Sequence, residues 1–213
     1  MSDEFIKRMI SSIILLPLSF YLIIKGSFFL IFFTIICFIV ACFEWHTMTK
    51  KKSYYIYGFI FLIFSFYTFY ELSIELIDIF YVIIICSSTD IGGYVFGKIF
   101  KGPKLTKISP KKTYSGVVGG YLFSIISIYF FVKYSVIFDL GFEKNFFNID
   151  LLILLFTTST VSQIGDIIIS YFKRVSKIKD TGKIIPGHGG LLDRIDGMIF
   201  AFPFGYLFLL ILN

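Results

Sequence analysis

Long apolar segments separated by short polar stretches make up almost the whole chain. Seven such segments occur, at residues 9–24, 28–43, 54–69, 74–96, 117–136, 151–172 and 198–212. Each approaches the roughly 20 apolar residues that a helix needs to cross the hydrocarbon core of a bilayer. The pattern therefore predicts an all-α fold, a polytopic integral membrane bundle of about seven transmembrane helices.

The composition excludes a soluble globular protein. Hydrophobic residues make up 57% of the chain and charged residues only 16%, against roughly 25% charged residues in soluble domains. The three cysteines, Cys37, Cys42 and Cys86, lie inside predicted spans without the spacing of metal ligands, so we expect packed free thiols. A transporter with an acidic ion path is disfavoured, because such folds often contain inverted repeats and this sequence has no visible repeat.

Basic residues are distributed unevenly between the polar stretches. Seventeen of the 20 Lys and Arg residues fall before residue 9 or in the stretches 44–53, 97–116 and 173–197, and the other three are Lys25, Lys133 and Lys144. Cytoplasmic loops hold the excess of Lys and Arg, so the N-terminus is predicted to be cytoplasmic and the C-terminus outside. We attribute the basic residues of stretch 44–53 to topology alone. The stretches 97–116 and 173–197 are long enough to form binding loops.

The sixth predicted span contains a carboxylate, Asp166. An Asp at the centre of a transmembrane helix costs about 3 kcal/mol, and such residues are functional candidates by default. On a helix Asp166, Ser170 and Lys173 share one face. The alternative is that Asp166 only pairs with a Lys or Ser to join two helices, and we favour a functional role. For Asp90, near the end of the fourth span, both interpretations stay open.

The polar stretch 173–197 combines small residues with two acids. Its turn-forming residues are Pro186, Gly187, Gly189 and Gly190. They permit a tight loop whose backbone N–H groups can approach an oxyanion. Asp193 and Asp196 are three residues apart, so they share a helix face and suit Mg²⁺, which binds through one or two carboxylates and substrate phosphates. The alternative is a favourable charge pattern at a helix N-terminus.

Residues 170–196 carry a specific sequence motif. They contain Ser-x-Phe-Lys-Arg, Lys-Asp-x-Gly and Ile-Pro-x-His-Gly-Gly-Leu-x-Asp-Arg-Ile-Asp. This segment resembles, without a departure, the signature of the phosphatidate cytidylyltransferases, the CDP-diacylglycerol synthases. Residues 89–94 and 109–116 resemble further family motifs more loosely, and Glu44-Trp45 resembles an early family feature. Tyr114-Ser115 stands where many members carry Trp-Glu, so the role of that Glu is not carried over.

The resemblance implies a reaction and its partners. Phosphatidic acid and CTP would give CDP-diacylglycerol and pyrophosphate for phospholipid biosynthesis, in a bilayer, with no nucleic acid and with a homodimer as a further expectation. A CTP-dependent lipid kinase of the polyprenol or phytol type is the main alternative, and it would transfer the γ-phosphoryl group instead. The unbroken motif favours cytidylyl transfer, and a relative that uses another phospholipid stays open.

The resemblance also assigns roles to individual residues. The implied catalytic residues are Asp166, Lys173, Arg174, His188, Asp193 and Asp196. The implied substrate-binding residues are Asp90, Ser109, Lys111, Lys112, Thr113, Ser170, Gly189, Gly190 and Arg194. Asp166, Asp193 and Asp196 would hold Mg²⁺, with a second, monovalent cation such as K⁺ at the same centre. Because the attacking phosphate is already ionised, His188 is expected to orient a phosphate, bind the lipid headgroup or hold the loop.

Two further expectations concern organisation and location. We divide a single membrane domain into N-terminal helices, residues 1–86, and a catalytic region, residues 87–213. The protein is expected in a bacterial inner membrane with its active site facing the cytoplasm. Gly93 and Gly97, and again Gly116 and Gly120, are four residues apart, a spacing that permits close helix contact and that a dimer could use.

Overall fold

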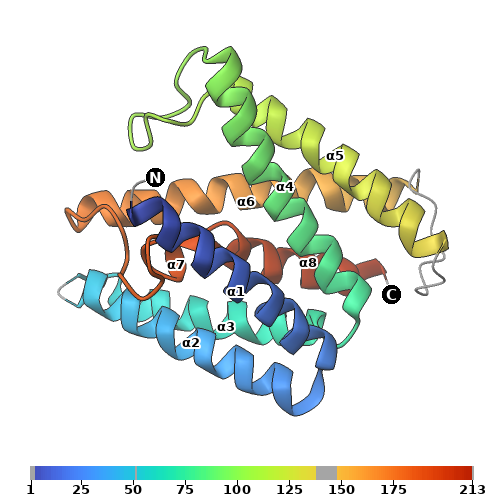
Figure 1. Ribbon diagram of the computed structural model, residues 1–213, viewed down its shortest axis with the longest axis horizontal. Helices are drawn as coiled ribbons and strands as arrows, with labels where there is room; N and C mark the ends of the chain where they lie inside the picture. The colour runs from blue at the N-terminus through green and yellow to red at the C-terminus, as the bar shows by residue number, and fades with distance from the viewer. Residues whose placement is uncertain (1–2, 51, 138–147, 213) are drawn as a thin grey trace. The chain divides into compact units, whose positions relative to one another are not determined.

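Helices form almost all of the regular structure in the computed structural model, which describes residues 3–50, 52–137 and 148–212. Within these residues the helices are α1 (Asp3–Lys25), α2 (Ser27–Thr49), α3 (Tyr55–Leu72), α4 (Leu76–Phe100), α5 (Tyr114–Ile137), α6 (Ile149–Val175), α7 (Leu192–Ile195) and α8 (Met198–Leu212) (Figure 1). Helices α2 to α6 are long and apolar enough to cross a membrane, and α1 and α8 contain the shorter apolar segments Met9–Lys25 and Met198–Ile211. The predicted helical membrane fold is confirmed. Lys144, used in the orientation argument, lies outside the described residues.

The surface of these helices is inverted relative to that of a soluble protein. Large apolar side chains such as Ile13, Phe28 and Tyr57 are exposed, whereas Ser65 and Thr68 are fully buried. The Thr68 hydroxyl donates to the Ser65 carbonyl oxygen of its own helix at 2.9 Å. In a bilayer a polar group must find its partner within the protein, and such bonds within the helix satisfy that requirement. The exposed apolar surface is the part that fits hydrocarbon.

The chain divides into two compact units, each considered by itself. The first contains Met1–Leu76 and Phe172–Asp196, and the second contains Ile77–Tyr171 and Gly197–Asn213. Each unit combines segments that are distant in the sequence, so neither corresponds to one continuous stretch. The division expected at residue 86 was a functional one and stays a prediction.

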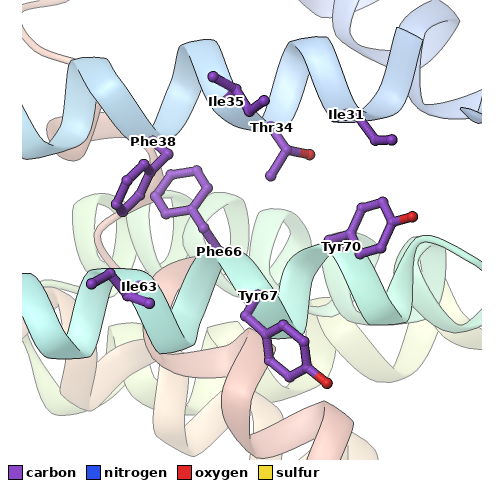
Figure 2. A pocket seen from close by; sticks show the side chains of 8 residues that line it. All are labelled: Ile31, Thr34, Ile35, Phe38, Ile63, Phe66, Tyr67 and Tyr70. Atoms are coloured by element: carbon purple, nitrogen blue, oxygen red, sulfur yellow. The ribbon is translucent and has the colours of Figure 1, made fainter. Parts of the chain in front are cut away.

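In the first unit, α1, α2 and α3 lie side by side (Figure 1). The rings of Phe38 and Phe66 meet edge to face, 5.6 Å between centroids, and join α2 to α3. Beside them an apolar groove of about 450 Å³ is lined by Ile31, Thr34, Ile35, Phe38, Ile63, Phe66, Tyr67 and Tyr70 (Figure 2). The Thr34 hydroxyl donates to the Leu30 carbonyl of its own helix. The groove therefore presents an almost wholly apolar lining.

Trp45 fixes the C-terminal end of α2 against its neighbours in the first unit. Its ring is buried, lies edge-on to Phe172 with 5.3 Å between centroids, and donates from Nε1 to the Tyr55 carbonyl at 3.0 Å. Gly58 makes room for it, because a Cβ at that position would lie 1.9 Å from the indole. This packing places the last turn of α6 beside α2. The loop of the candidate site starts at this end of α6.

In the second unit, glycines let α4 and α5 approach closely near the loop that joins them (Figure 1). A Cβ on Gly119 would lie 2.7 Å from the Gly92 carbonyl oxygen, and one on Gly116 would lie 2.8 Å from that of Gly93. The expected close helix contact is confirmed, although Gly92 and Gly119 replace Gly97 and Gly120 in the tightest pairs. Farther along, the core of this unit is formed by Tyr81, Ile85, Ile128, Val132, Leu151, Leu154 and Leu155.

Candidate active site

The loop that carries most of the predicted site starts where α6 ends. Lys177 adopts a left-handed conformation, φ 58°, and the Ile178 and Lys177 amides donate to the Lys173 and Arg174 carbonyls, both at 3.0 Å. This pair of bonds is the Schellman arrangement that ends helices. The Ser176 hydroxyl donates to the Met48 carbonyl of α2 at 2.9 Å. The chain is thereby turned sharply and tied to α2 before the loop begins.

The predicted glycine turn is present. The Ile185 amide donates to the Gly189 carbonyl at 2.9 Å, and the His188 amide donates to the Ile185 carbonyl at 3.0 Å. Gly187 and Gly189 have φ values of 75° and 92°, which side chains with a Cβ rarely adopt. The turn therefore requires glycine at these two positions. This agrees with the tight loop that the sequence predicts.

Asp193 braces both ends of this loop. Its Oδ2 accepts from the Thr181 amide at 2.8 Å and the Gly190 amide at 2.9 Å, and its Oδ1 accepts from Lys173 Nζ at 2.9 Å. Burial raises the pKa of this carboxyl, but the Gly190 amide, Lys173 and the Thr181 amide lower it more, so the pKa lies below its usual value. Asp193 is thus an ionised anchor at neutral pH.

Glu44 of α2 is the second anchor, and the only indication of it in the sequence was the pair Glu44-Trp45. The side chain is 1% exposed. It accepts from the Thr181 hydroxyl at 2.9 Å and from the Leu191 and Leu192 amides at 2.8 Å each. These partners are 137 to 148 residues away in sequence, so no local pattern could reveal them.

His188 is held by two serines of α1. Ser11 Oγ lies 2.8 Å from Nδ1 and 3.0 Å from the Pro186 carbonyl, and Ser12 Oγ lies 3.3 Å from Nε2. A hydroxyl has one proton, so a Ser11 that donates to Pro186 must accept from Nδ1–H. Nε2 is then the acceptor for Ser12. Of the three roles expected for His188, holding the loop is the one these contacts favour.

The other charged residues of the first unit that were predicted to belong to the site differ in their surroundings. Arg194 is exposed and donates from Nη2 to the His188 carbonyl at 2.9 Å, and Arg174 is exposed and donates to the Ile178 carbonyl at 3.4 Å. Both guanidinium groups keep further donors for a ligand. Lys173 is buried, and its ammonium group forms an ion pair with Asp193. Asp196, half-buried, lies at the C-terminal end of α7.

In the second unit, Lys112 and Asp166 form an ion pair, with Lys112 Nζ 2.5 Å from Asp166 Oδ2. Lys112 Nζ also donates to the Gln163 carbonyl at 3.3 Å, and the Ser170 hydroxyl donates to Asp166 Oδ1 at 3.4 Å. The polar face predicted for α6 is therefore confirmed for Asp166 and Ser170. Lys112 and Lys111, which the sequence could not separate, differ clearly, because Lys111 is exposed.

The loop between α4 and α5 is ordered by its own backbone. The Leu105 amide donates to the Lys112 carbonyl at 2.8 Å, and the Lys112 amide donates to the Ser109 carbonyl at 3.0 Å. The Thr113 hydroxyl accepts from the Gly116 amide at 3.1 Å, as an N-cap of α5 does. Thr113 thus has a structural task, and Ser109 takes part in a turn. Asp90 is exposed on α4, next to Thr89, whose hydroxyl bonds Ser159.

Two of the three predicted metal ligands, Asp166 and Asp193, form ion pairs with lysines. Among the described residues no group of three or more His, Cys, Asp or Glu side chains lies close enough to hold a metal ion. Asp166 faces Lys112 and Asp193 faces Lys173, so ammonium groups supply the positive charge beside both carboxylates. The donor chemistry, hard carboxylate oxygens, fits Mg²⁺, and the metal assignment stays a prediction.

Comparison with known proteins identifies similar sequences. The chain matches the Cytidylyltransferase family over residues 53–212. It is 36% identical over 207 residues to the phosphatidate cytidylyltransferase of Rickettsia felis, a match that covers 92% of this chain and 88% of that protein. It is 39% identical to the phosphatidate cytidylyltransferases of Haemophilus influenzae over 125 residues and of Bacillus subtilis over 132 residues. Those two matches cover 42% and 46% of the relatives, less than half their length.

Proposed function

The chain belongs to the cytidylyltransferase family, and we propose that it joins the CMP unit of CTP to phosphatidic acid to make CDP-diacylglycerol. The observation that carries the proposal is the unbroken motif of residues 170–196, which folds into a tight glycine turn braced by Asp193 and Glu44. A match along 92% of the chain to the Rickettsia felis protein supports it.

The proposed reaction requires that the two anionic substrates be positioned and that their negative charge be neutralised. A phosphate oxygen of phosphatidic acid attacks the α-phosphorus of CTP, a new P–O bond forms, and the bond to the β-phosphate breaks to release pyrophosphate. The nucleophile is already ionised, so no strong general base is needed. The exposed guanidinium groups of Arg174 and Arg194 can offer bidentate contacts to phosphate oxygens. Lys111, Gly189 and Gly190 are the further proposed contacts to the substrates.

We propose Mg²⁺ as the cofactor, held by Asp166, Asp193 and Asp196. Bound there, the metal would neutralise the nucleotide phosphates and the leaving pyrophosphate. A second, monovalent cation such as K⁺ is part of the same proposal. Lys112 and Lys173 face two of these acids, so their ammonium groups already supply positive charge beside the proposed metal ligands.

The proposed location is a bacterial inner membrane, with the loops of the site in the cytoplasm. The charge distribution along the sequence supports this orientation, and anionic lipid at that surface would be attracted to the basic loops at about 1 kcal/mol per charge. A homodimer is also proposed. It would need a surface other than Gly92, Gly93, Gly116 and Gly119, because these glycines pack within one chain.

The test is an assay of the purified, detergent-solubilised protein with CTP, phosphatidic acid and Mg²⁺. CDP-diacylglycerol and pyrophosphate are expected in equal amounts, with loss of both when EDTA removes the metal and recovery when Mg²⁺ is added back. Formation of CDP and a phosphorylated lipid alcohol, from an added polyprenol, would instead show the lipid kinase. Product formation that is insensitive to EDTA would refute the metal proposal while leaving the reaction in place.

Replacing His188 with Ala should reduce turnover by less than about tenfold and leave the pH dependence of kcat/KM unchanged. Removing a general base costs about 10²–10⁴-fold, whereas the ring contacts of His188 tie the loop to Ser11 and Ser12. The comparison is His46→Ala, whose ring contacts Tyr55 on α3. A loss of 10³-fold together with the disappearance of a titration near neutral pH would show that His188 acts as the base.

A further inference from the structure

Glu44 is a negative charge built into the base of a loop that is proposed to bind anions. Its carboxyl group is 1% exposed, so it is shielded from a ligand and from water. A buried carboxylate beside an anion site opposes binding through its charge, and its burial is costly unless hydrogen bonds compensate. The reason for an acid at this position must therefore lie in what it holds.

What Glu44 holds is both ends of the loop at once. Oε2 accepts from the Thr181 hydroxyl and the Leu192 amide, and Oε1 accepts from the Leu191 amide, all at 2.8 to 2.9 Å. Asp193 binds the same two ends through the Thr181 and Gly190 amides. Asp193 belongs to the loop segment itself, whereas Glu44 comes from α2. Glu44 is therefore the acid that fixes the loop to the helical scaffold.

The loop sequence is shaped to fit this side chain. A Cβ on Gly182 would lie 2.7 Å from Glu44 Oε1, and one on Gly190 would lie 2.5 Å from Oε2. Neither contact leaves space for a larger residue. Gly190 was expected to approach a substrate phosphate, and the structure gives it a second reason to be glycine. The residues between the anchored ends, among them Lys183 and Ile184, are exposed.

We propose that Glu44 is a positioning residue for the cytidylyl transfer: from α2 it holds residues 181–192 in the shape that receives a phosphate, without touching the substrate. The inference rests on the proposed function for its kinetic part only. The family model matches residues 53–212, so that match does not include Glu44.

The first experiment compares Glu44→Gln with Glu75→Gln in the full-length protein. A carboxamide has one acceptor oxygen and two N–H donors, so it cannot accept from all three partners of Glu44. Glu75 is exposed between α3 and α4 and serves as the matched control. Hydrogen–deuterium exchange of the Leu191 and Leu192 amides should accelerate about tenfold or more in Glu44→Gln and stay unchanged in Glu75→Gln.

Kinetics separate positioning from general instability. For Glu44→Gln we expect a rise of about tenfold in the KM of at least one anionic substrate, with a smaller change in kcat, because the loop is displaced while the other groups stay in place. Equal exchange in wild type and Glu44→Gln would overturn the proposal, as would faster exchange with unaltered KM values. If wild type makes no CDP-diacylglycerol, the proposed function fails, and the exchange result still decides whether Glu44 anchors the loop.

A double-mutant cycle with Thr181→Val tests the contact directly. Valine keeps the shape of threonine but lacks the hydroxyl that donates a hydrogen bond to Glu44. If the two side chains act through this bond, the double variant should lose less than the product of the two single losses in kcat/KM. Strictly multiplicative losses would mean that Glu44 and Thr181 act independently, and the anchoring role would then be rejected.

Discussion

Replacing Asp193 with Asn should abolish turnover, reducing kcat/KM by at least about 10³-fold. Asp193 accepts three hydrogen bonds, from Lys173 Nζ and from the Thr181 and Gly190 amides, and an Asn carboxamide cannot replace all of them. The side chains of Lys173 and Asp193 are 10% and 6% exposed. Removing one partner of such a buried pair costs about 3–5 kcal/mol, so the folded loop should also become less stable.

The double variant Lys173→Met, Asp193→Asn separates the anchoring role from metal binding. It removes the buried charge pair as a unit, so stability measured by thermal unfolding should recover in part. Turnover should stay absent if Asp193 is also a ligand of Mg²⁺. Recovery of turnover above a tenth of wild type in the double variant would show that Asp193 serves only as an anchor.

The pKa of Asp193 sets the pH range of this effect. Its folded pKa lies below the ordinary value of 3.8, so its ionised form contributes stability above that value, and the contribution is lost as pH falls below it. Between about pH 5 and pH 8 the anchor keeps its charge. The difference in stability between wild type and Asp193→Asn should therefore be constant over that range.

Much of the architecture could be predicted from the sequence because a bilayer imposes a length and a polarity on every span. The seven apolar segments and the polar face of α6 follow from local patterns of spacing. The close contact of α4 and α5 could also be expected from small residues, but the register could not. Gly92 and Gly119 form the tightest pair, and choosing them over neighbouring glycines requires the crossing geometry of the two helices.

The candidate site was harder to predict because its geometry depends on contacts between distant segments. The motif marked Asp193 and the glycine turn, yet Glu44 lies 137 to 148 residues from its partners. The contact between Ser11 and His188 spans 177 residues. Lys111 and Lys112 look equivalent in sequence, and only the fold makes one exposed and pairs the other with Asp166. Residue types could be anticipated locally, whereas partners could not.

Replacing Asp166 with Asn should also remove turnover, by about 10²–10³-fold or more, without preventing membrane insertion. Asp166 forms an ion pair with Lys112 and accepts a hydrogen bond from the Ser170 hydroxyl. In the variant, Lys112 loses its counterion while its backbone contact to Gln163 remains. Asp150→Asn, at the opposite end of the same helix, makes the same chemical change away from the site and should retain near wild-type turnover.

Variants of the two neighbouring lysines, Lys111 and Lys112, test whether Asp166 acts together with Lys112. Lys112→Met should lose much of the turnover, whereas Lys111→Met should lose little, because Lys111 is exposed and Lys112 is in the ion pair. If the two groups work as a unit, adding Lys112→Met to Asp166→Asn should cause almost no further loss. Asp166→Asn with more than a tenth of wild-type turnover would instead assign the pair to helix packing, since a carboxylate used only to join α6 to the loop can be replaced at small catalytic cost.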